Sequence, residues 1–323
     1  MINFQTPILF LIYNRLETTQ RVFEAIRRAQ PKQLFVAADG PRLDREGDKE
    51  KCGATRRIIE QIDWDCEVKT LFREENLGCK TGVSSAINWF FENVEEGIIL
   101  EDDCLPIDSF FPFCQLMLEK YRNNSSIGMI AGTNYLFSYN DFQYSYYLSK
   151  HCYVWGWATW KRAWSLYDLS ISHFPENLFL RNYLQDSLSS NYYLDQFDYF
   201  KFNKIDTWDI QWSATLMKNK LYSIVPVNNQ ISNIGLAGTH TEKKVSLSIN
   251  MPSKAMDIDE IKHPPTVVYD NVLDLVSMKN IVYKVIKTPV LKTLLIKIIN
   301  RKNINFLKKI WPFKLYYYVG SKK

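Results

Sequence analysis

The chain has 323 residues, of which 46% are hydrophobic and 23% are charged, with 12 Gly and 12 Pro. This composition excludes a fully disordered chain, and it allows one α/β domain with an extended second half or two average domains. The net charge of +5 is unevenly distributed. Residues 275–323 contain many Lys and Arg but no acidic residue, so the chain before them is net acidic.

The cysteines and the N-terminal residues favour a cytoplasmic protein. The six cysteines show no CxxC spacing and no nearby pair of His, which argues against a zinc site and against a disulfide scaffold. The N-terminal apolar run leads directly into Asn14 and Arg15 and lacks the pattern of a cleaved signal peptide. We therefore expect a buried strand there and a cytoplasmic location.

Short apolar runs alternate with helical patterns in the first part of the chain. The runs of strand length are residues 7–13, 34–38, 68–72 and 97–100. Apolar residues recur at helical spacing in residues 18–29 and 82–93. This alternation predicts a Rossmann-like α/β domain with a mostly parallel central sheet.

Polar residues follow three of these runs, where ligands bind in open parallel sheets. Glu101, Asp102 and Asp103 are three adjacent acids, and such a concentration of like charge favours a cation, Mn²⁺ or Mg²⁺, that would also neutralise a diphosphate. Arg15, after Asn14, could hold phosphate oxygens, and Asp39 could accept from a base or a ribose. The alternatives are an acidic turn that caps a helix near residue 108 and ordinary polar strand exits.

Residues 76–80 (NLGCK) open the second helical pattern. Their backbone N–H groups and Lys80 could meet phosphate or sugar oxygens. Taken alone, the motif fits an ordinary helix start better.

Residues 126–245 are less regular and rich in aromatic side chains, as expected for an acceptor-binding half. Trp155, Gly156, Trp157 and Trp208 could contact a sugar, because aromatic faces stack on sugar C–H surfaces and Gly allows close approach. A core role for these tryptophans is an equal alternative. Asp209 stands between tryptophans that would limit its hydration and raise its pKa, as a general base requires.

His240 occurs late in this half, within the sequence Gly238-Thr239-His240-Thr241. It could touch a phosphate or the metal. A loop histidine with satisfied hydrogen bonds is the alternative.

Several of these segments, in this order, resemble glycosyltransferases of the GT-A fold. They are residues 7–15 (PILFLIYNR), 35–41 (FVAADGP), 76–80 (NLGCK), 98–104 (IILEDDC) and 106–111 (PIDSFF), followed by the Gly156-Trp157 and Trp208-Asp209 elements. The resemblance is to family 2-like bacterial sugar transferases and to the N-acetylglucosaminyltransferase I group, and it covers about residues 5–240.

The resemblance implies a role for each strand-end residue. Arg15 would contact the diphosphate of the donor and Asp39 its uracil. Asp102 would bind the ribose, Asp103 the metal, and Glu101 would lie near the donor sugar. Asp209 would be the base of an inverting transfer, although residues 208–212 read WDIQW here, where the related group has two adjacent acids.

The sequence divides into a catalytic domain at residues 1–245, a linker at 246–275 and a basic tail at 276–323. The catalytic domain has a nucleotide-sugar half at 1–125 and an acceptor half at 126–245. Leu291, Leu294, Leu295 and Ile298 form an apolar stripe among Lys and Arg. No apolar run in the tail is long enough to cross a bilayer. We therefore expect the tail to lie on an anionic membrane surface. Packing on the acidic domain is the alternative.

These observations favour a metal-dependent enzyme that moves a sugar from a UDP-linked donor, such as a UDP-N-acetylhexosamine, to a glycan or lipid-linked acceptor. An inactive carbohydrate-binding or scaffolding protein on the same fold is the alternative from another class. A nucleotidyltransferase should carry a Gly-rich loop after its first strand, and residues 13–17 contain no Gly. No nucleic-acid-binding module is recognisable, so we expect no nucleic acid partner.

Overall fold

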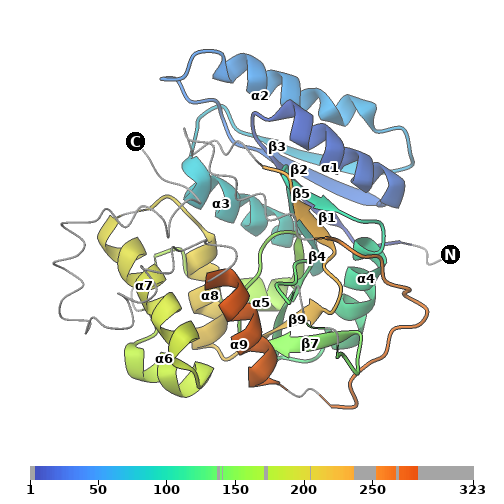
Figure 1. Cartoon of the computed structure of the whole chain (residues 1–323). Coiled ribbons are helices and arrows are strands. Elements are labelled where there is room, and N and C mark those ends of the chain that lie inside the picture. Colours follow the sequence, from blue (N-terminus) through green and yellow to red (C-terminus); the bar gives the residue numbers. More distant parts are fainter. Residues whose placement is uncertain are drawn as a thin grey trace.

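The computed structural model describes residues 4–136, 139, 141–170, 174–203, 205–235, 252–266 and 269–282. Its centre is an eight-stranded sheet with the order β3-β2-β1-β4-β8-β6-β9-β7 (Figure 1). The strands of this sheet are β1 (Ile8–Ile12), β2 (Gln33–Ala38), β3 (Glu67–Phe72), β4 (Glu96–Glu101), β6 (Ile127–Ala131), β7 (Tyr146–Ser149), β8 (Trp157–Trp160) and β9 (Tyr222–Pro226). A small second sheet pairs β5 (Cys104–Pro106) with β10 (Ile231–Asn233).

The sheet is mostly parallel, as the alternating pattern predicts. Strands β3, β2, β1 and β4 are all parallel, and the register places Leu11 of β1 opposite Ala37 of β2 and Glu101 of β4. β8 is antiparallel to both of its neighbours, β4 and β6. Beyond it, β9 is parallel to β6 and antiparallel to β7.

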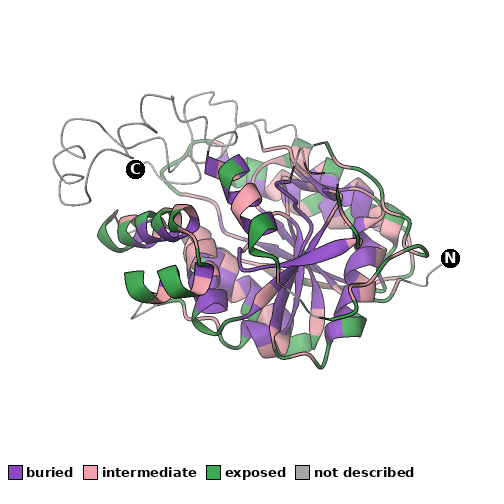
Figure 2. Cartoon of the chain, turned by 60° about the horizontal axis from the view of Figure 1, so that its bottom comes forward, coloured by how far each residue is buried: buried purple, intermediate pink, exposed green. Residues whose placement is uncertain are grey.

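Helices cover both faces of this sheet. They are α1 (Leu16–Ala29), α2 (Asp48–Arg56), the 3₁₀ helix η1 (Arg57–Gln61), α3 (Gly78–Asn93), α4 (Phe110–Tyr121), α5 (Lys161–Trp164), α6 (Asn177–Leu184), α7 (Ser187–Asn203), α8 (Asp209–Lys218) and α9 (Asn271–Asn280). Alternate residues of β1 point to opposite faces: Phe10 packs with α1 and α4, whereas Leu9 packs with α3, α5 and α8. Figure 2 shows the resulting arrangement, with buried strands between helices whose outer faces are exposed.

The predicted elements of residues 7–100 are confirmed, with boundaries that differ by a few residues. The largest difference is at α3, which begins at Gly78 rather than at residue 82. The sequence pattern did not reveal α2, because that helix is strongly polar and its buried residues are few.

The folded part of the chain continues beyond residue 245, where the sequence places the end of the catalytic domain. Tyr269 forms a bridge with Leu148 of β7, and α9 follows. The side chain of Asp274 is buried and accepts hydrogen bonds from the Ser149 hydroxyl and from Lys150 N at 2.8 Å. Residues 252–266 and α9 therefore pack on the domain, whereas residues 283–323, including the stripe at 291–298, lie outside the described residues. Within the part that is described, no helix is long and apolar enough to cross a membrane.

Candidate active site

The carboxyl ends of β1 and β4 bring Arg15 to the acidic triplet. These strands are adjacent and parallel, so the residues that follow them meet at one edge of the sheet. The Arg15 guanidinium forms a close ion pair with Asp102 and a second one with Asp103, at 3.0 Å between Nη1 and Oδ2. The side chain of Asp102 is 4% exposed and that of Asp103 is 17% exposed, so Asp103 is the more accessible of the two.

Burial sets the protonation of this cluster. Burial, followed by the charges of Asp103 and Asp102, raises the pKa of Glu101 to about 8. Burial also raises the pKa of Asp102, to about 6, although Arg15 opposes this shift. Burial lowers the pKa of Arg15, but the two aspartates outweigh it and hold that pKa above its ordinary value. An added positive charge would stabilise the ionised carboxylates.

The chain after β10 covers this ion pair closely. Ile234 N donates to the backbone oxygen of Asp103 at 2.8 Å. Gly235 follows, and a Cβ at that position would stand 2.4 Å from Asp103 Oδ2 and 3.1 Å from Arg15 Nη1. A side chain at this position would displace Asp103 or Arg15, so the backbone of Gly235 borders the acidic end of the site.

The chemistry of these residues fits a hard divalent cation. Among the residues with described positions, no group of three or more His, Cys, Asp or Glu side chains is arranged to hold a metal ion by itself. Mg²⁺, however, commonly binds through one or two carboxylates, substrate phosphates and water. Asp103 has a partly exposed carboxylate beside the backbone of Gly235, so it could bind Mg²⁺ together with phosphates and water.

Asp39 lies at the end of β2 and faces the start of α3. Its carboxylate accepts from Leu77 N at 2.9 Å, from Gly78 N at 3.0 Å and from Asn76 Nδ2 at 3.0 Å. Burial raises its pKa, and these backbone hydrogen bonds oppose the shift. Asp39 therefore has a fixed orientation at the sheet edge where the sequence predicts nucleotide contact.

Asn14 belongs to a cluster around Asp48, a residue that the sequence analysis missed. Asp48 is 3% exposed and accepts from Asn14 Nδ2 at 2.5 Å, from Tyr13 Oη at 2.7 Å and from Arg42 Nε at 3.1 Å. Burial raises the pKa of Asp48, but Arg42 and Tyr13 outweigh it, and the pKa lies below its ordinary value. This ionised carboxylate fixes the end of β1 immediately before Arg15. The run of charged residues around Asp48 gives no sign that one of them is buried.

The start of α3 differs from the prediction for residues 76–80. Asp206, which the sequence did not single out, accepts from Cys79 N at 2.7 Å and from Lys80 N at 2.8 Å. Together with Asp39, it occupies the N–H groups that were expected to meet phosphate. The Lys80 ammonium lies 5.5 Å from the ring centroid of Phe200 in α7.

Asp209 is the first residue of α8. It accepts from the Thr207 hydroxyl and from Ile210 N, the latter at 3.0 Å. Burial raises its pKa, and these hydrogen bonds oppose the shift. Its charge in turn raises the pKa of Glu101 and of the partly exposed Cys79 thiol, after burial and the charges of nearer acids for Glu101 and after burial and Glu101 for Cys79.

The tryptophans predicted to contact a sugar differ in their burial. Trp157 and Trp208 are 1% and 2% exposed, and their rings stack at a centroid distance of 5.7 Å. Neither offers a ring face to a sugar, and Gly156 is buried as well, so only Trp155 of the four predicted sugar contacts is partly exposed. Trp155 is partly buried against Tyr135, and Gly156 has φ +59°, with Ile231 Cδ1 only 2.4 Å from where a Cβ would be. His240 lies outside the described residues.

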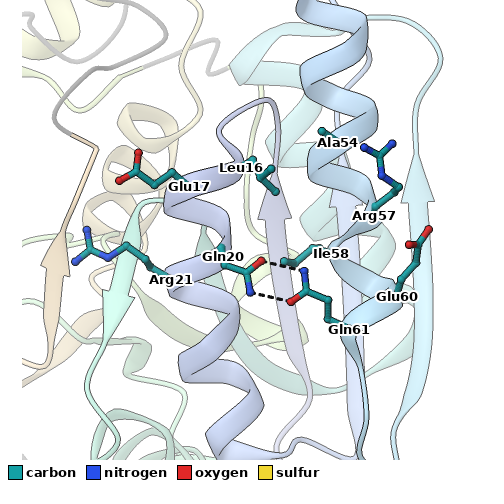
Figure 3. A pocket seen from close by; sticks show the side chains of 9 residues that line it. All are labelled: Leu16, Glu17, Gln20, Arg21, Ala54, Arg57, Ile58, Glu60 and Gln61. Carbon is teal, nitrogen blue, oxygen red and sulfur yellow. Dashed lines mark hydrogen bonds between the residues drawn. The ribbon is translucent and has the colours of Figure 1, made fainter.

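A separate surface groove of about 600 Å³ lies between α1 and the α2–η1 segment (Figure 3). Two reciprocal amide hydrogen bonds cross it, from Gln20 to Gln61 at 2.8 Å and back at 3.0 Å. None of the residues predicted for the donor site lines it, so this groove is distinct from the acidic sheet edge.

No protein-family model and no curated protein matches the chain. Among solved structures, HddC from Yersinia pseudotuberculosis has a TM-score of 0.30 at 9% identity. The matched region covers 49% of this chain and 78% of the HddC chain. Apo UDP-glucose pyrophosphorylase has a TM-score of 0.37 at 9% identity, with 72% of this chain and 93% of that chain covered. UDP-glucose pyrophosphorylase complexed with UDP-glucose gives 0.36 at 12% identity, with 70% and 90% covered. Likeness at this level does not bear on the reaction.

Proposed function

We propose that this protein is a metal-dependent glycosyltransferase that moves a sugar from a UDP-linked donor to a hydroxyl group of a glycan or lipid-linked acceptor. The transfer inverts the anomeric carbon and serves surface polysaccharide or glycoconjugate synthesis. The observation that carries the proposal is the convergence of Arg15 with Asp102 and Asp103 at the carboxyl edge of the sheet. A site in which an arginine stands beside several carboxylates, with Asp102 buried and Asp103 partly exposed, suits a diphosphate that brings a metal with it.

Asp209 acts as the general base in this proposal. Its ionised carboxylate accepts the proton of the acceptor hydroxyl while that oxygen forms a bond with the anomeric carbon. The bond from this carbon to the phosphate oxygen breaks, and UDP leaves with the electron pair. Because burial raises the pKa of Asp209, the carboxylate is a stronger base than an exposed aspartate.

The donor side neutralises and orients the leaving group. Arg15 holds diphosphate oxygens, Asn14 and Lys80 border them, Asp39 binds the uracil and Asp102 the ribose, while Glu101 lies beside the donor sugar. Asp103 would hold the Mn²⁺ or Mg²⁺ ion, and the ion would supply positive charge to the departing diphosphate. On the acceptor side, Trp155 contacts the acceptor sugar. The basic tail brings the enzyme to the inner face of the membrane.

The first experiment is a thermal unfolding series with UDP, GDP, CMP and dTDP, each with and without Mn²⁺. A ligand that binds only the folded state at a hundred times its dissociation constant adds about 2.7 kcal/mol of stability. We expect UDP to raise the melting temperature only with Mn²⁺, and Asp103→Ala to abolish the shift. Asp65→Ala is the matched control, because Asp65 forms an exposed ion pair with Lys32 just before β3, at the opposite edge of the sheet.

The outcomes separate the candidate functions. A shift with another nucleotide keeps the enzyme class and replaces the donor. A glycan that binds without any nucleotide effect would support the scaffolding protein. Release of pyrophosphate from UTP and a sugar phosphate would identify a nucleotidyltransferase instead.

A further inference from the structure

The residues just before Asp209 form a tight turn, and the first and last residues of this turn are buried. Ile205 and Thr207 are buried, at 3% and 7% exposure. Thr207 N donates to the oxygen of Ile205 at 3.1 Å, which closes a turn of three residues. Asp206 stands at the tip of this turn, and its side chain is directed to α3, where it accepts its two hydrogen bonds.

The contact of Asp206 with α3 joins the two halves of the domain. The N–H groups of the first helical turn have no partner inside their own helix. At α3, Asp39 accepts from Leu77 and Gly78, whereas Asp206 accepts from Cys79 and Lys80, although Asp206 is 127 residues away from Cys79 in the sequence. One helix start therefore holds a carboxylate from the donor half and a carboxylate from the acceptor half.

Gly78 permits this close approach. Its φ of +78° is a conformation that residues with side chains rarely adopt, and a Cβ there would lie 2.4 Å from Asp206 Oδ2. The residue type at position 78 is thus constrained both by backbone conformation and by the Asp206 carboxylate.

We propose that Asp206 is a positioning residue that fixes the Asp209 carboxylate relative to the donor side of the site. Asp206 holds the turn against α3, and the next residue, Thr207, donates its hydroxyl hydrogen to Asp209. This inference rests on the proposed function, because it gives Asp209 the role of base. Displacement of a reacting group by about 1 Å can lower a rate about 100-fold.

Asp206→Ala tests this inference with three measurements. We expect kcat for UDP release from UDP-N-acetylglucosamine with Mn²⁺ to fall about 10- to 100-fold. The melting-temperature shift caused by UDP and Mn²⁺ should remain, because Asp206 does not belong to the predicted donor contacts. Hydrogen exchange should become faster at the amides of Cys79 and Lys80 and also at Ile210, whose N–H is bonded to Asp209.

Two further variants separate positioning from simple helix capping. Asp206→Asn keeps one carbonyl oxygen as an acceptor and should recover most of the lost kcat. Asp270→Ala is the matched control: Asp270 caps α9 by accepting from Val272 N at 2.8 Å, and its loss should lower stability without any change in kcat.

A second pair of variants tests the same contact from the side of α3. Gly78→Ala should reproduce the loss of kcat in Asp206→Ala. Gly47→Ala is its control, because Gly47 has φ +73° but nothing within 4 Å of an added Cβ. Gly47→Ala should introduce backbone strain without a steric clash, and it should leave kcat unchanged.

The inference is overturned if Asp206→Ala keeps the wild-type kcat, or if exchange accelerates at Cys79 and Lys80 but not at Ile210. It is also overturned if Asp206→Ala loses the UDP shift in the same proportion as kcat. Failure of the proposed function has a different signature, since the wild-type protein would then show neither a UDP shift nor UDP release. In that case the exchange rate at Ile210 still decides whether Asp206 orders this segment.

Discussion

The two halves of the domain place their functional side chains by different means. In the first half, β3, β2, β1 and β4 are parallel, and Arg15, Asp39 and the acidic triplet follow directly from strands at one edge. In the second half, the sheet is mixed and Asp209 is placed by contacts between distant segments, including the stacking of Trp208 on Trp157. Regular sheet geometry positions the residues proposed to bind the donor, whereas side-chain packing and helix caps position the proposed base.

Replacement of the proposed base should give the largest effect and test the acceptor half most directly. Asp209→Asn keeps the shape of the side chain but cannot accept a proton, so kcat should fall about 10²- to 10⁴-fold. The stabilisation by UDP and Mn²⁺ should persist, because the donor half is unchanged. Asp186→Asn is the control, since Asp186 accepts from Ser189 N at 2.7 Å near the start of α7. A kcat for Asp209→Asn within tenfold of wild type would remove Asp209 from the mechanism.

Loss of a core tryptophan should show how far the acceptor half depends on aromatic packing. Trp157→Ala removes a ring that is 1% exposed, and should lower the free energy of unfolding by about 3–5 kcal/mol in urea titrations. Trp155→Ala should lower it by about 1 kcal/mol and mainly raise the KM for the acceptor, because Trp155 is only partly buried. Equal losses of stability would show that the two tryptophans do not divide into core and site.

The acidic edge of the donor half should make stability depend on pH. The pKa of Glu101 is raised from 4.5 to about 8 in the folded protein, so the folded state holds this proton more tightly than the unfolded chain. Stability without divalent cations should therefore fall as pH rises from 5 to 8. The Gln side chain in Glu101→Gln cannot ionise. Between pH 5 and 8 the free energy of unfolding of this variant, measured in urea titrations, should therefore fall by less than that of the wild type, with a difference on the order of 2 kcal/mol. Glu119→Gln, at an exposed position in α4, should follow the wild type.

The smallest expected effect concerns the hydrogen bond from Thr207 to Asp209. This bond lowers the pKa of Asp209 against the effect of burial, so its removal in Thr207→Val should raise that pKa. A hydrogen bond to a charged group contributes about 1.5 kcal/mol, which corresponds to roughly one pKa unit. The acidic limb of the kcat profile should move to higher pH by about that amount, with little change above it. Thr207→Ser keeps the hydroxyl group, and a shift of the same size in that variant would contradict the explanation.

The sequence predicts the donor half well because its signals are local. An apolar run of strand length ending in Asn14-Arg15, or in Glu101-Asp102-Asp103, gives both the strand and the edge at which its polar residues meet. The meeting of Arg15 with Asp102 and Asp103 then follows from parallel pairing of β1 with β4.

The remaining features depend on long-range contacts that no local pattern carries. The place of β8 between β4 and β6 follows from pairing over large sequence separations. Asp48 lies in a run of charged residues and Asp206 belongs to no local motif, so only the fold shows that one is buried and the other docks on α3. Aromatic density around residues 155–164 likewise does not indicate which rings face the core.

The central position of β4 also has a consequence for biosynthesis. One side of β4 pairs with β1, which is made earlier, but the other side pairs with β8, which ends at Trp160. At ribosomal speeds of about 5–20 residues per second, the apolar strand waits on the order of 3–12 s for this partner. An unpaired apolar edge attracts strands from other chains. A chaperone that binds the nascent chain during this interval should therefore raise soluble yield more than one that acts after release.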